Sequence, residues 1–223
     1  MEEIFRVGFL PGTIKFPVGM CNTYTLKRDF LKAGRRGGKW NLTEQQIQNI
    51  DHGEQWIFRP TKPAPVYVKE TGLTLMRWGF ERPWAKAINN ARIEKANSAT
   101  WKKAWENGRC LIPLSGWYEF TGPPGKMTAH LLEAVDGSDL LAAGLWEPGE
   151  GTGDAFTMVM TESGGVMKEL HTRMPIILSE EDAERFLAAD FSELRPSGID
   201  VRSRIVPSPL KKRKDSPVQE ELF

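Results

Sequence analysis

Short apolar runs, most of them bounded by Gly, Pro, Ser or Asp, fill the middle of the sequence. They are VYVK, TLMRW, CLIPL, WYEF, HLLEAV, LLAAGLW, FTMVM and MPIIL. Apolar runs of this length between turn-forming residues are typical of β-strands. They do not alternate regularly with long helical segments, which disfavours a doubly wound parallel sheet. We therefore expect an α+β fold: a single strand-rich domain with a curved or barrel-like, mostly antiparallel sheet.

Three segments carry helical signals. Thr43 and Gln46 have the spacing of a capping box before EQQIQNI, and Trp101 and Trp105 stand four residues apart in TWKKAWENG. Ser179 precedes EEDAERFLAA as a capping residue would. These patterns predict short helices that flank the sheet.

The two ends differ from the middle. Residues 1–19 are interrupted by glycine and proline, and the end of the chain, PSPLKKRKDSPVQEELF, combines three prolines with a basic run. We expect an N-terminal extension over residues 1–19, one domain over 20–208, and a mobile tail with basic and acidic residues over 209–223. No linker or repeat divides the middle.

Composition excludes several classes of protein. No run approaches the roughly 18 apolar residues of a membrane helix, and the acidic start MEEIFR is unlike a secretory signal. Two cysteines are too few for a disulfide framework or a cysteine zinc cluster, and the three histidines lie far apart. We expect a cytoplasmic monomer without membrane contact, metal or cofactor. The net charge of +1 makes no case for nucleic acid, so any such case must come from local clusters.

Cys21 follows Met20, and this dipeptide offers a special chemistry. If translation began at Met20, removal of that methionine would leave a cysteine at the amino terminus. Such a cysteine is a 1,2-aminothiol, whose amine condenses with an aldehyde and whose thiolate then closes a thiazolidine ring. The alternative is a buried, unreactive small residue, which is how we interpret Cys110.

Four further residues are candidates for chemistry, each with an ordinary alternative. Glu119 lies among aromatic residues in SGWYEF, where burial would raise its pKa and make it a general acid, but it also fits an exposed strand position. His171 in LHTRMPIIL fits a proton shuttle or a hydrogen-bonded loop residue. Asn90 and Arg92 in INNARIEK offer an amide partner and a phosphate fork, or surface contacts.

A basic stretch, KRDFLKAGRRGGKW, follows Cys21 closely. Its cationic residues Lys27, Arg28, Arg35 and Arg36, together with the eight tryptophans of the chain, suggest contacts with a phosphate backbone and stacked bases. A solvated loop and core tryptophans are the alternative interpretation.

Seven segments, taken in order, resemble the SRAP family of SOS-response-associated peptidase proteins, which sense abasic sites in single-stranded DNA. They are MCNTYT, FRPTKPAPV, RWGFERPWAK, INNARIEK, RCLIPLSGWYEF, MTESGG and LHTRMPIIL. The resemblance runs from about residue 20 to about residue 205. The pairing of NAR-x-E with RCLIP-x-x-G-x-YE, followed by H-x-RMP, is its most specific part.

This resemblance implies a strand-rich barrel and a covalent function. The family's catalytic positions fall on Cys21, Asn90, Glu119 and His171, and its phosphate-binding arginine falls on Arg92. Trp78 and Pro60 match positions that pack or stack along the DNA path. The implied activity is a thiazolidine crosslink between Cys21 and an abasic site in single-stranded DNA, formed by lyase-like imine chemistry. The crosslink would shield the lesion during the DNA damage response, with the protein on the nucleoid when bound to DNA.

The sequence departs from the family pattern near its start and leaves other functions open. Nineteen residues precede Met20, Asn22-Thr23 replace Gly-Arg, and Arg59 stands before Pro60 in place of a small or apolar residue. The extension reflects either an upstream start or a propeptide cut by the protein itself at Met20-Cys21. Two alternatives are a cysteine peptidase with Cys21 as nucleophile, His171 as base and Asn90 as the orienting residue, and a non-covalent binder of single-stranded DNA.

Overall fold

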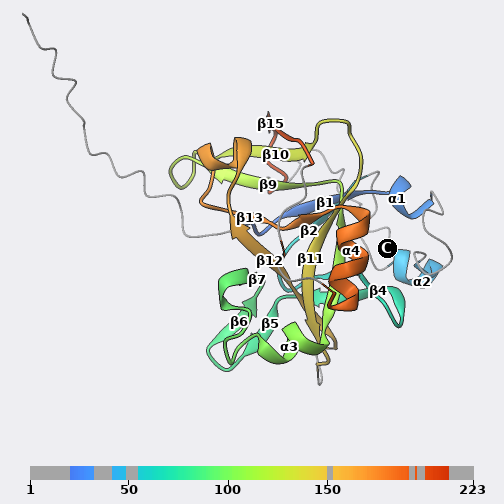
Figure 1. Cartoon of the computed structure of the whole chain (residues 1–223). Coiled ribbons are helices and arrows are strands. Elements are labelled where there is room, and N and C mark those ends of the chain that lie inside the picture. Colours follow the sequence, from blue (N-terminus) through green and yellow to red (C-terminus); the bar gives the residue numbers. More distant parts are fainter. Residues whose placement is uncertain are drawn as a thin grey trace, which may run out of the picture.

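The computed structural model describes residues 21–32, 42–48, 55–149, 153–190, 194 and 199–210. The predicted extension over 1–19, the basic residues Arg35 and Arg36, and residues 211–223 of the predicted tail lie outside this range. Figure 1 shows the described chain as a single strand-rich domain with a few short helices.

A five-stranded antiparallel sheet holds the start of the described chain. Its order is β15-β10-β9-β1-β2, and in Figure 1 β9, β10 and β15 cross the top of the view. The strands are β1 (Tyr24–Lys27), β2 (Gln55–Phe58), β9 (Gly116–Thr121), β10 (Thr128–Ala134) and β15 (Val201–Val206).

A second, eight-stranded sheet is nearly closed. β12 pairs with β4 on one side and with β11 on the other, so that β12, β4, β3, β8 and β11 form a ring. β7 and β4 run parallel to β12, and the other pairs in this sheet are antiparallel. The strands are β3 (Pro63–Val68), β4 (Gly72–Trp78), β7 (Asn90–Arg92), β8 (Arg109–Leu114), β11 (Leu140–Glu147), β12 (Ala155–Glu162), β13 (Arg173–Pro175) and β14 (Ile177–Leu178).

A hairpin of β5 (Phe80–Arg82) and β6 (Ala85–Ile88) leads from β4 into β7. Gly79 joins β4 to this hairpin with a φ of +109°, a conformation that favours glycine, and a Cβ there would lie 2.8 Å from the Ala87 Cβ. The tight connection fixes where the hairpin ends and therefore where Asn90 begins its strand.

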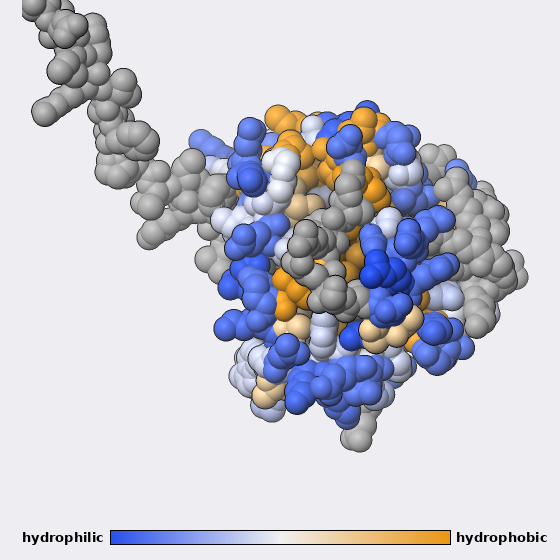
Figure 2. All heavy atoms as spheres, in the orientation of Figure 1, coloured by the Kyte–Doolittle hydropathy of each residue, from blue (hydrophilic) through white to orange (hydrophobic). Residues whose placement is uncertain are grey.

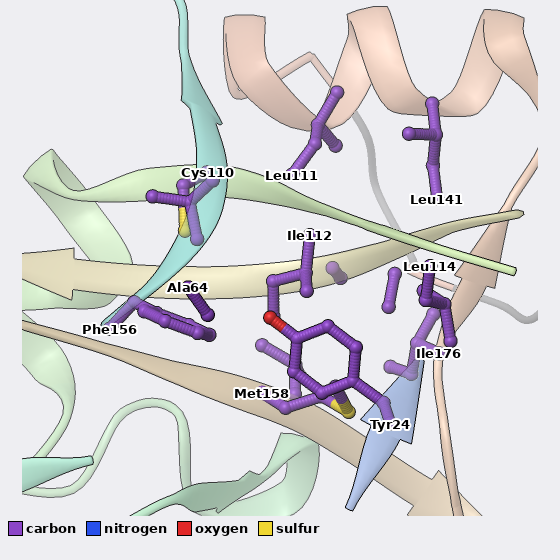
Figure 3. Close-up of a cluster of buried hydrophobic side chains, with 14 of the residues drawn as sticks. Tyr24, Ala64, Cys110, Leu111, Ile112, Leu114, Leu141, Phe156, Met158 and Ile176 are labelled. Carbon is purple, nitrogen blue, oxygen red and sulfur yellow. The ribbon is translucent and has the colours of Figure 1, made fainter. Parts of the chain in front are cut away.

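Buried aromatic rings join the two sheets. Tyr24 of β1 lies 5.0 Å from Phe58 of β2 and 5.0 Å from Trp78 of β4, measured between ring centroids. Trp78 in turn stacks on Phe156 of β12 at 6.2 Å. Figure 3 shows the Tyr24 ring among core side chains that include Ile112 and Met158. Burial of such large aromatic side chains stabilises the fold and holds β1 against the strands of the second sheet.

The helices are short, and the three expected segments are all helical. They are α1 (Asp29–Lys32), α2 (Glu44–Gln48), α3 (Lys102–Asn107) and α4 (Glu180–Ala188), with 3-10 turns η2 (Ile93–Lys95) and η3 (Gly165–Glu169). The capping box is present, because Gln46 N donates to Thr43 Oγ1 at 3.2 Å and Thr43 N donates to Gln46 Oε1 at 2.8 Å. Ser179 caps α4 by accepting from Asp182 N. Among the α-helices of the described residues, α1 alone was not predicted, because four residues carry too little periodic pattern.

The predicted fold class is confirmed, and one apolar run behaves differently from the expectation. MPIIL divides at Ile176, because Ile176 N bonds to Val159 O of β12 while Ile176 O accepts from Ala143 N of β11. The run therefore passes from one neighbour to another as β13 and β14. Figure 2 shows mostly hydrophilic residues on the visible described surface, with hydrophobic ones toward the top near β10 and β15. Within the described ranges, no helix has the length and hydropathy to cross a membrane.

Candidate functional site

Cys21 lies three residues before the first residue of β1 and is 1% exposed. Its thiol donates a long hydrogen bond, 3.8 Å, to the carbonyl oxygen of Thr23. Burial raises the pKa of the Cys21 thiol well above its usual value, and the nearby charge of Glu119 raises it further. The thiol is therefore held in its protonated form until a base or a change of environment removes the proton.

Glu119 lies on β9 beside Cys21. Strand pairing brings them together, because Tyr24 pairs with Trp117 and Tyr118 N donates to Thr23 O at 2.9 Å. The Glu119 carboxylate accepts a hydrogen bond from the backbone N–H of Cys21, and its side chain is 3% exposed. Burial raises its pKa to about 8, although the Cys21 N–H lowers it in part. A carboxyl group that titrates near neutral pH can both donate and accept protons.

Asn90 begins β7 and holds the carbonyl group of Cys21. Its Nδ2 donates to Cys21 O at 3.0 Å. The parallel pairing of β7 with β12 fixes this position, with Asn90 opposite Met158. Asn89 Nδ2 also donates to Cys21 O, at 3.4 Å. The side chains of two consecutive asparagines thus contact one carbonyl oxygen.

The backbone of Asn89 connects the site to the aromatic core. Its carbonyl oxygen accepts from Trp78 Nε1 at 2.9 Å and from Met158 N at 3.0 Å. Trp78 itself is fully buried. In this structure Trp78 therefore lies beneath the site and positions it, without an indole face at the surface.

Neighbouring residues hold the nitrogen, the carbonyl oxygen and the sulfur of Cys21. Its nitrogen contacts Glu119, its carbonyl oxygen contacts Asn90 and Asn89, and its sulfur contacts Thr23. Within the described residues, Glu119 Oε1 and Asn90 Oδ1 are buried without a hydrogen-bond partner. Unsatisfied buried polar atoms are costly and often mark a site that binds a further group. The geometry suits a reaction at the Cys21 nitrogen and sulfur.

His171 is half-buried in the turn before β13. Its Nδ1 accepts a hydrogen bond from Arg173 N at 3.0 Å, which leaves Nε2 as the nitrogen able to carry a proton outward. The described residues show no hydrogen bond between His171 and Cys21 or Glu119. The structure thus brings Cys21, Asn90 and Glu119 into direct contact and leaves His171 outside that contact set.

Arg92 lines an open basic pocket of 470 Å³ at the end of β7. Lys168 and Arg173 also line it, together with Glu162, Ser163 and Thr172. Arg173 forms an ion pair with Glu94, and its Nη1 is buried without a partner among the described residues. Our interpretation of the sequence missed Arg173 and Lys168, although Arg173 stands inside the HTRMP motif. Three cations around one pocket are suited to binding a phosphate.

Pro60 and Arg59 follow β2 close to the start of β1. Phe58, which precedes Arg59, pairs with Tyr24, which follows Thr23. Arg59 and Thr23 therefore lie at the same end of the β1–β2 pair. Thr23 is 1% exposed, and its hydroxyl donates to Asn22 Oδ1 at 3.2 Å. Arg59 is exposed, and its Nη2 donates to Pro209 O at 2.9 Å. Arg59 thus stands just beyond the end of β2, next to the strand pair that Thr23 precedes.

Trp84, at the tip of the β5–β6 hairpin, is 71% exposed. An ion pair between Arg82 and Glu147 anchors this hairpin, with two hydrogen bonds of 2.5 and 2.8 Å. The sequence signal for Trp84 was the same as for Trp78, since both occur in RWGFERPW. Exposed aromatic rings on a fixed hairpin are suited to stacking.

Among the other predicted DNA-binding residues, those that the structure describes do not line the pocket of Arg92. Lys27 and Arg28 line a different pocket, at the far end of β1. Arg35 and Arg36 lie outside the described residues. In the part of the chain that the structure describes, no group of three His, Cys, Asp or Glu side chains could hold a metal ion.

Comparison with known proteins gives a family and a fold. A family model described as SOS response associated peptidase (SRAP) matches residues 20–210. The abasic site processing protein YMR114C of Saccharomyces cerevisiae is 29% identical over 130 residues, 53% of this chain and 35% of the relative. YoqW of Bacillus subtilis, of the same description, is 32% identical over 124 residues, 50% of this chain and 55% of the relative.

YedK of Escherichia coli, also named an abasic site processing protein, is 27% identical over 128 residues, 55% of this chain and 58% of the relative. The alignments thus span about a third to somewhat over half of the relatives' length. Among solved structures, a Bacteroides thetaiotaomicron protein has a TM-score of 0.72 at 19% identity, covering 91% of this chain and 100% of that one. A Bordetella bronchiseptica protein has a TM-score of 0.68 at 20% identity, covering 84% and 100%.

Proposed function

Because the chain belongs to the SOS response associated peptidase (SRAP) family, we propose that it processes abasic sites in single-stranded DNA by forming a covalent bond through Cys21. The names of its relatives support the substrate. The observation that carries the proposal is the hydrogen bond between the Cys21 nitrogen and the buried Glu119 carboxylate, made while Asn90 holds the Cys21 carbonyl.

The proposed reaction begins at the nitrogen of Cys21. The free α-amine attacks the aldehyde carbon of the ring-opened sugar, and Glu119 accepts the proton that the nitrogen loses. Glu119 then returns a proton to the carbinolamine hydroxyl, which leaves as water and gives an imine. The Cys21 sulfur adds to the imine carbon, its proton passes to the nitrogen, and a five-membered thiazolidine closes.

Each neighbouring residue has a role in this scheme. Asn90, assisted by Asn89, fixes the backbone so that the amine and the thiol face the same carbon. His171, through Nε2, transfers a proton to and from the sugar ring oxygen. Arg92, Arg173 and Lys168 bind a phosphate next to the lesion. Trp84 stacks on a neighbouring base, and Pro60 with Arg59 borders the strand.

The reaction requires a free amine on Cys21, whereas a chain that includes Met20 carries an amide there. An acylated nitrogen cannot form the imine. Cys21 must therefore become the first residue, either through initiation at Met20 and removal of that methionine, or through cleavage of the Met20–Cys21 bond by the protein itself. Glu119 already contacts the nitrogen that would leave in such a cleavage.

The test compares the full 223-residue chain with a chain that begins at Met20. Each is incubated with single-stranded DNA that contains one abasic site, and products are analysed by denaturing gel and intact mass. Mass spectrometry first establishes whether the methionine has been removed. We expect a covalent adduct from the chain with free Cys21, with a mass equal to protein plus DNA minus one water, and no adduct from Cys21→Ala.

Other outcomes point to other functions. Peptide hydrolysis that survives a blocked amine would indicate a cysteine peptidase. Wild-type behaviour of Cys21→Ala on abasic DNA would indicate a non-covalent binder. Either result would overturn the crosslinking proposal.

A further inference from the structure

The five-stranded sheet has two faces, and only one of them carries Glu119. Neighbouring residues of a strand point to opposite faces, so on β9 Trp117 and Glu119 share one face and Tyr118 lies on the other. Tyr24 pairs with Trp117 and therefore shares the Glu119 face. Lys27, three residues along β1, lies on the Tyr118 face.

A cluster of charged side chains occupies this second face. Gln55 pairs with Lys27, and Arg204 pairs with Leu131, which pairs with Tyr118. Two residues along β10 from Leu131, Glu133 also lies on this face. The proximity of these groups is reflected in Tyr118, because its pKa, which burial raises, is lowered by the charge of Arg204 and raised by that of Glu133.

A pocket of 510 Å³ opens on this face. Its lining includes Lys27, Arg28, Gln55, Ser115, Glu133 and Arg204. Asp29 completes the lining. The basic pocket that contains Arg92 shares none of these residues. The two pockets are therefore distinct sites.

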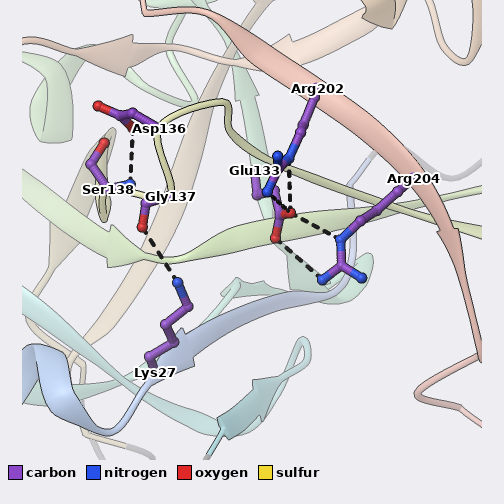
Figure 4. A network of polar contacts seen from close by, with 7 residues as sticks. All are labelled: Lys27, Glu133, Asp136, Gly137, Ser138, Arg202 and Arg204. Carbon is purple, nitrogen blue, oxygen red and sulfur yellow. Dashed lines mark hydrogen bonds and ion pairs between the residues drawn. The ribbon is translucent and has the colours of Figure 1, made fainter.

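Two arginines compensate the negative charge of Glu133, so the pocket keeps a net positive charge. Its carboxylate accepts hydrogen bonds from Arg202 at 2.9 Å and from Arg204 at 2.9 Å (Figure 4). Both arginine side chains remain about half exposed, at 52% and 55%. With Lys27, Arg28 and Asp29 included, the formal charges of the cluster sum to about +2 at neutral pH.

Two cations of the pocket keep donors available. Lys27 Nζ has a single weak bond, 3.4 Å, to Gly137 O (Figure 4), so further ammonium protons stay free. No hydrogen bond or ion pair with another described residue holds the exposed Arg28 guanidinium. Gln55 adds an exposed amide at the edge. Free donors around a positively charged hollow are suited to bind a phosphate oxygen.

We propose that this pocket is a second phosphate-binding site, which holds the backbone of the same DNA strand several nucleotides from the lesion. The inference rests on the proposed function for its ligand. Lys27 lies six residues after Cys21 in the chain, but the pocket is on the sheet face opposite Glu119. A strand that contacts both sites must pass around the sheet, so we expect it to be longer than about 7 nucleotides, at a rise of about 3.4 Å each.

The experiment measures non-covalent binding of the full 223-residue chain to undamaged single-stranded DNA over a range of salt concentrations. Oligonucleotides of about 7 and about 25 nucleotides are compared, because only the longer one can reach both pockets. We expect the double variant Lys27→Gln/Arg28→Gln to bind the long strand roughly 3- to 30-fold more weakly at low salt, with a salt slope smaller by about 1.4. Binding of the short strand should weaken less, because a short strand can occupy only one of the two pockets at a time.

Two further variants test whether the effect results merely from a lost surface charge or from misfolding. Lys103→Gln removes an exposed charge on α3 and should leave binding of both strands unchanged. Glu133→Gln removes the one carboxylate that Arg202 and Arg204 share, so it should tighten binding of the long strand and steepen its salt slope. An increase in affinity cannot result from misfolding.

The outcomes separate this proposal from the proposed function. Crosslinking of a short abasic oligonucleotide by the free-Cys21 chain reports on Cys21 alone. If the double variant binds the long strand like the wild type, the second site is wrong even when crosslinking is intact. If inorganic phosphate stabilises the wild type but not the double variant, and DNA affinity is unchanged, the pocket takes a free anion and the DNA proposal is overturned.

Discussion

The side-chain amide of Asn90 donates a 3.0 Å hydrogen bond to the carbonyl oxygen of Cys21, a residue 69 positions earlier in the chain. This bond joins the segment that precedes β1 to β7, which is itself positioned by β12. It orients the Cys21 backbone through the carbonyl oxygen, while the nitrogen contacts Glu119 and the sulfur contacts Thr23.

Replacing Asn90 should therefore slow crosslinking without changing which product forms. In the free-Cys21 chain, Asn90→Ala is expected to lower the single-turnover crosslinking rate by about 10- to 100-fold, because misplacement of reacting groups by about 1 Å costs this much. Asn89→Ala is the matched control and should have a smaller effect, since its amide lies 3.4 Å from the same oxygen. Equal losses in both variants would contradict the assigned roles.

Glu119 should make stability depend on pH. Its pKa is about 8 in the folded chain and 4.5 as a reference, so between these values the folded state binds a proton that the unfolded state has released. The free energy of unfolding should therefore fall as pH rises from about 4.5 to about 8, by up to roughly 5 kcal/mol, and then level off. Glu119→Gln should remove this dependence.

Urea unfolding of the wild type and Glu119→Gln at pH 5 and pH 9 measures the effect. Glutamine keeps an oxygen that can accept the Cys21 N–H bond, so the variant isolates the titration. The stability of the variant relative to the wild type should be greater at pH 9 than at pH 5. A difference that is the same at both pH values would mean that Glu119 does not hold a raised pKa.

The two tryptophans of RWGFERPW should behave differently. Trp78→Ala removes a fully buried ring and should lower the free energy of unfolding by about 3–5 kcal/mol. Trp84→Ala changes an exposed hairpin tip, so stability should change by less than about 0.5 kcal/mol. DNA affinity of Trp84→Ala should fall by about 1–3 kcal/mol through lost base stacking, measured by fluorescence anisotropy. Unchanged affinity would remove Trp84 from the DNA path.

Arg92 should contribute one phosphate contact, which the salt dependence of DNA binding measures. Arg92→Gln is expected to reduce the slope of log affinity against log salt by about 0.7 for single-stranded DNA. Arg185→Gln on α4, far along the chain and paired with Asp182, is the control with the same charge change. If both variants shift the slope alike, Arg92 acts only through net charge.

The elements of the fold were predictable because they depend on local patterns. Thr43, Gln46 and Ser179 carry capping signals that need no knowledge of the rest of the chain. The apolar runs likewise identify strands by their own composition. Strands of three or four residues, such as β1 and β7, were missed because so short a segment has no measurable periodicity.

The site was predictable only as a set of residue types. Nothing in the spacing of Cys21, Glu119 and Asn90 shows that all three meet, because their contact depends on pairings between distant strands. The sequence also could not separate Trp78 from Trp84, since burial is decided by how the hairpin after Gly79 folds back. The distinct pocket at Lys27 follows from alternation along β1, which requires the strand to be known first.

The position of β12 between two functional strands limits how the chain can change in length. It pairs with β7, which carries Asn90 and Arg92, and also with β13, which carries Arg173. The pairing register of this one strand thus sets the positions of functional side chains that come from separate parts of the chain. Homologues should tolerate insertions in the loops between these strands, whereas deletion of one residue within β12 would shift both partners at once. Evolutionary change in length is therefore expected at the loops and not along this strand.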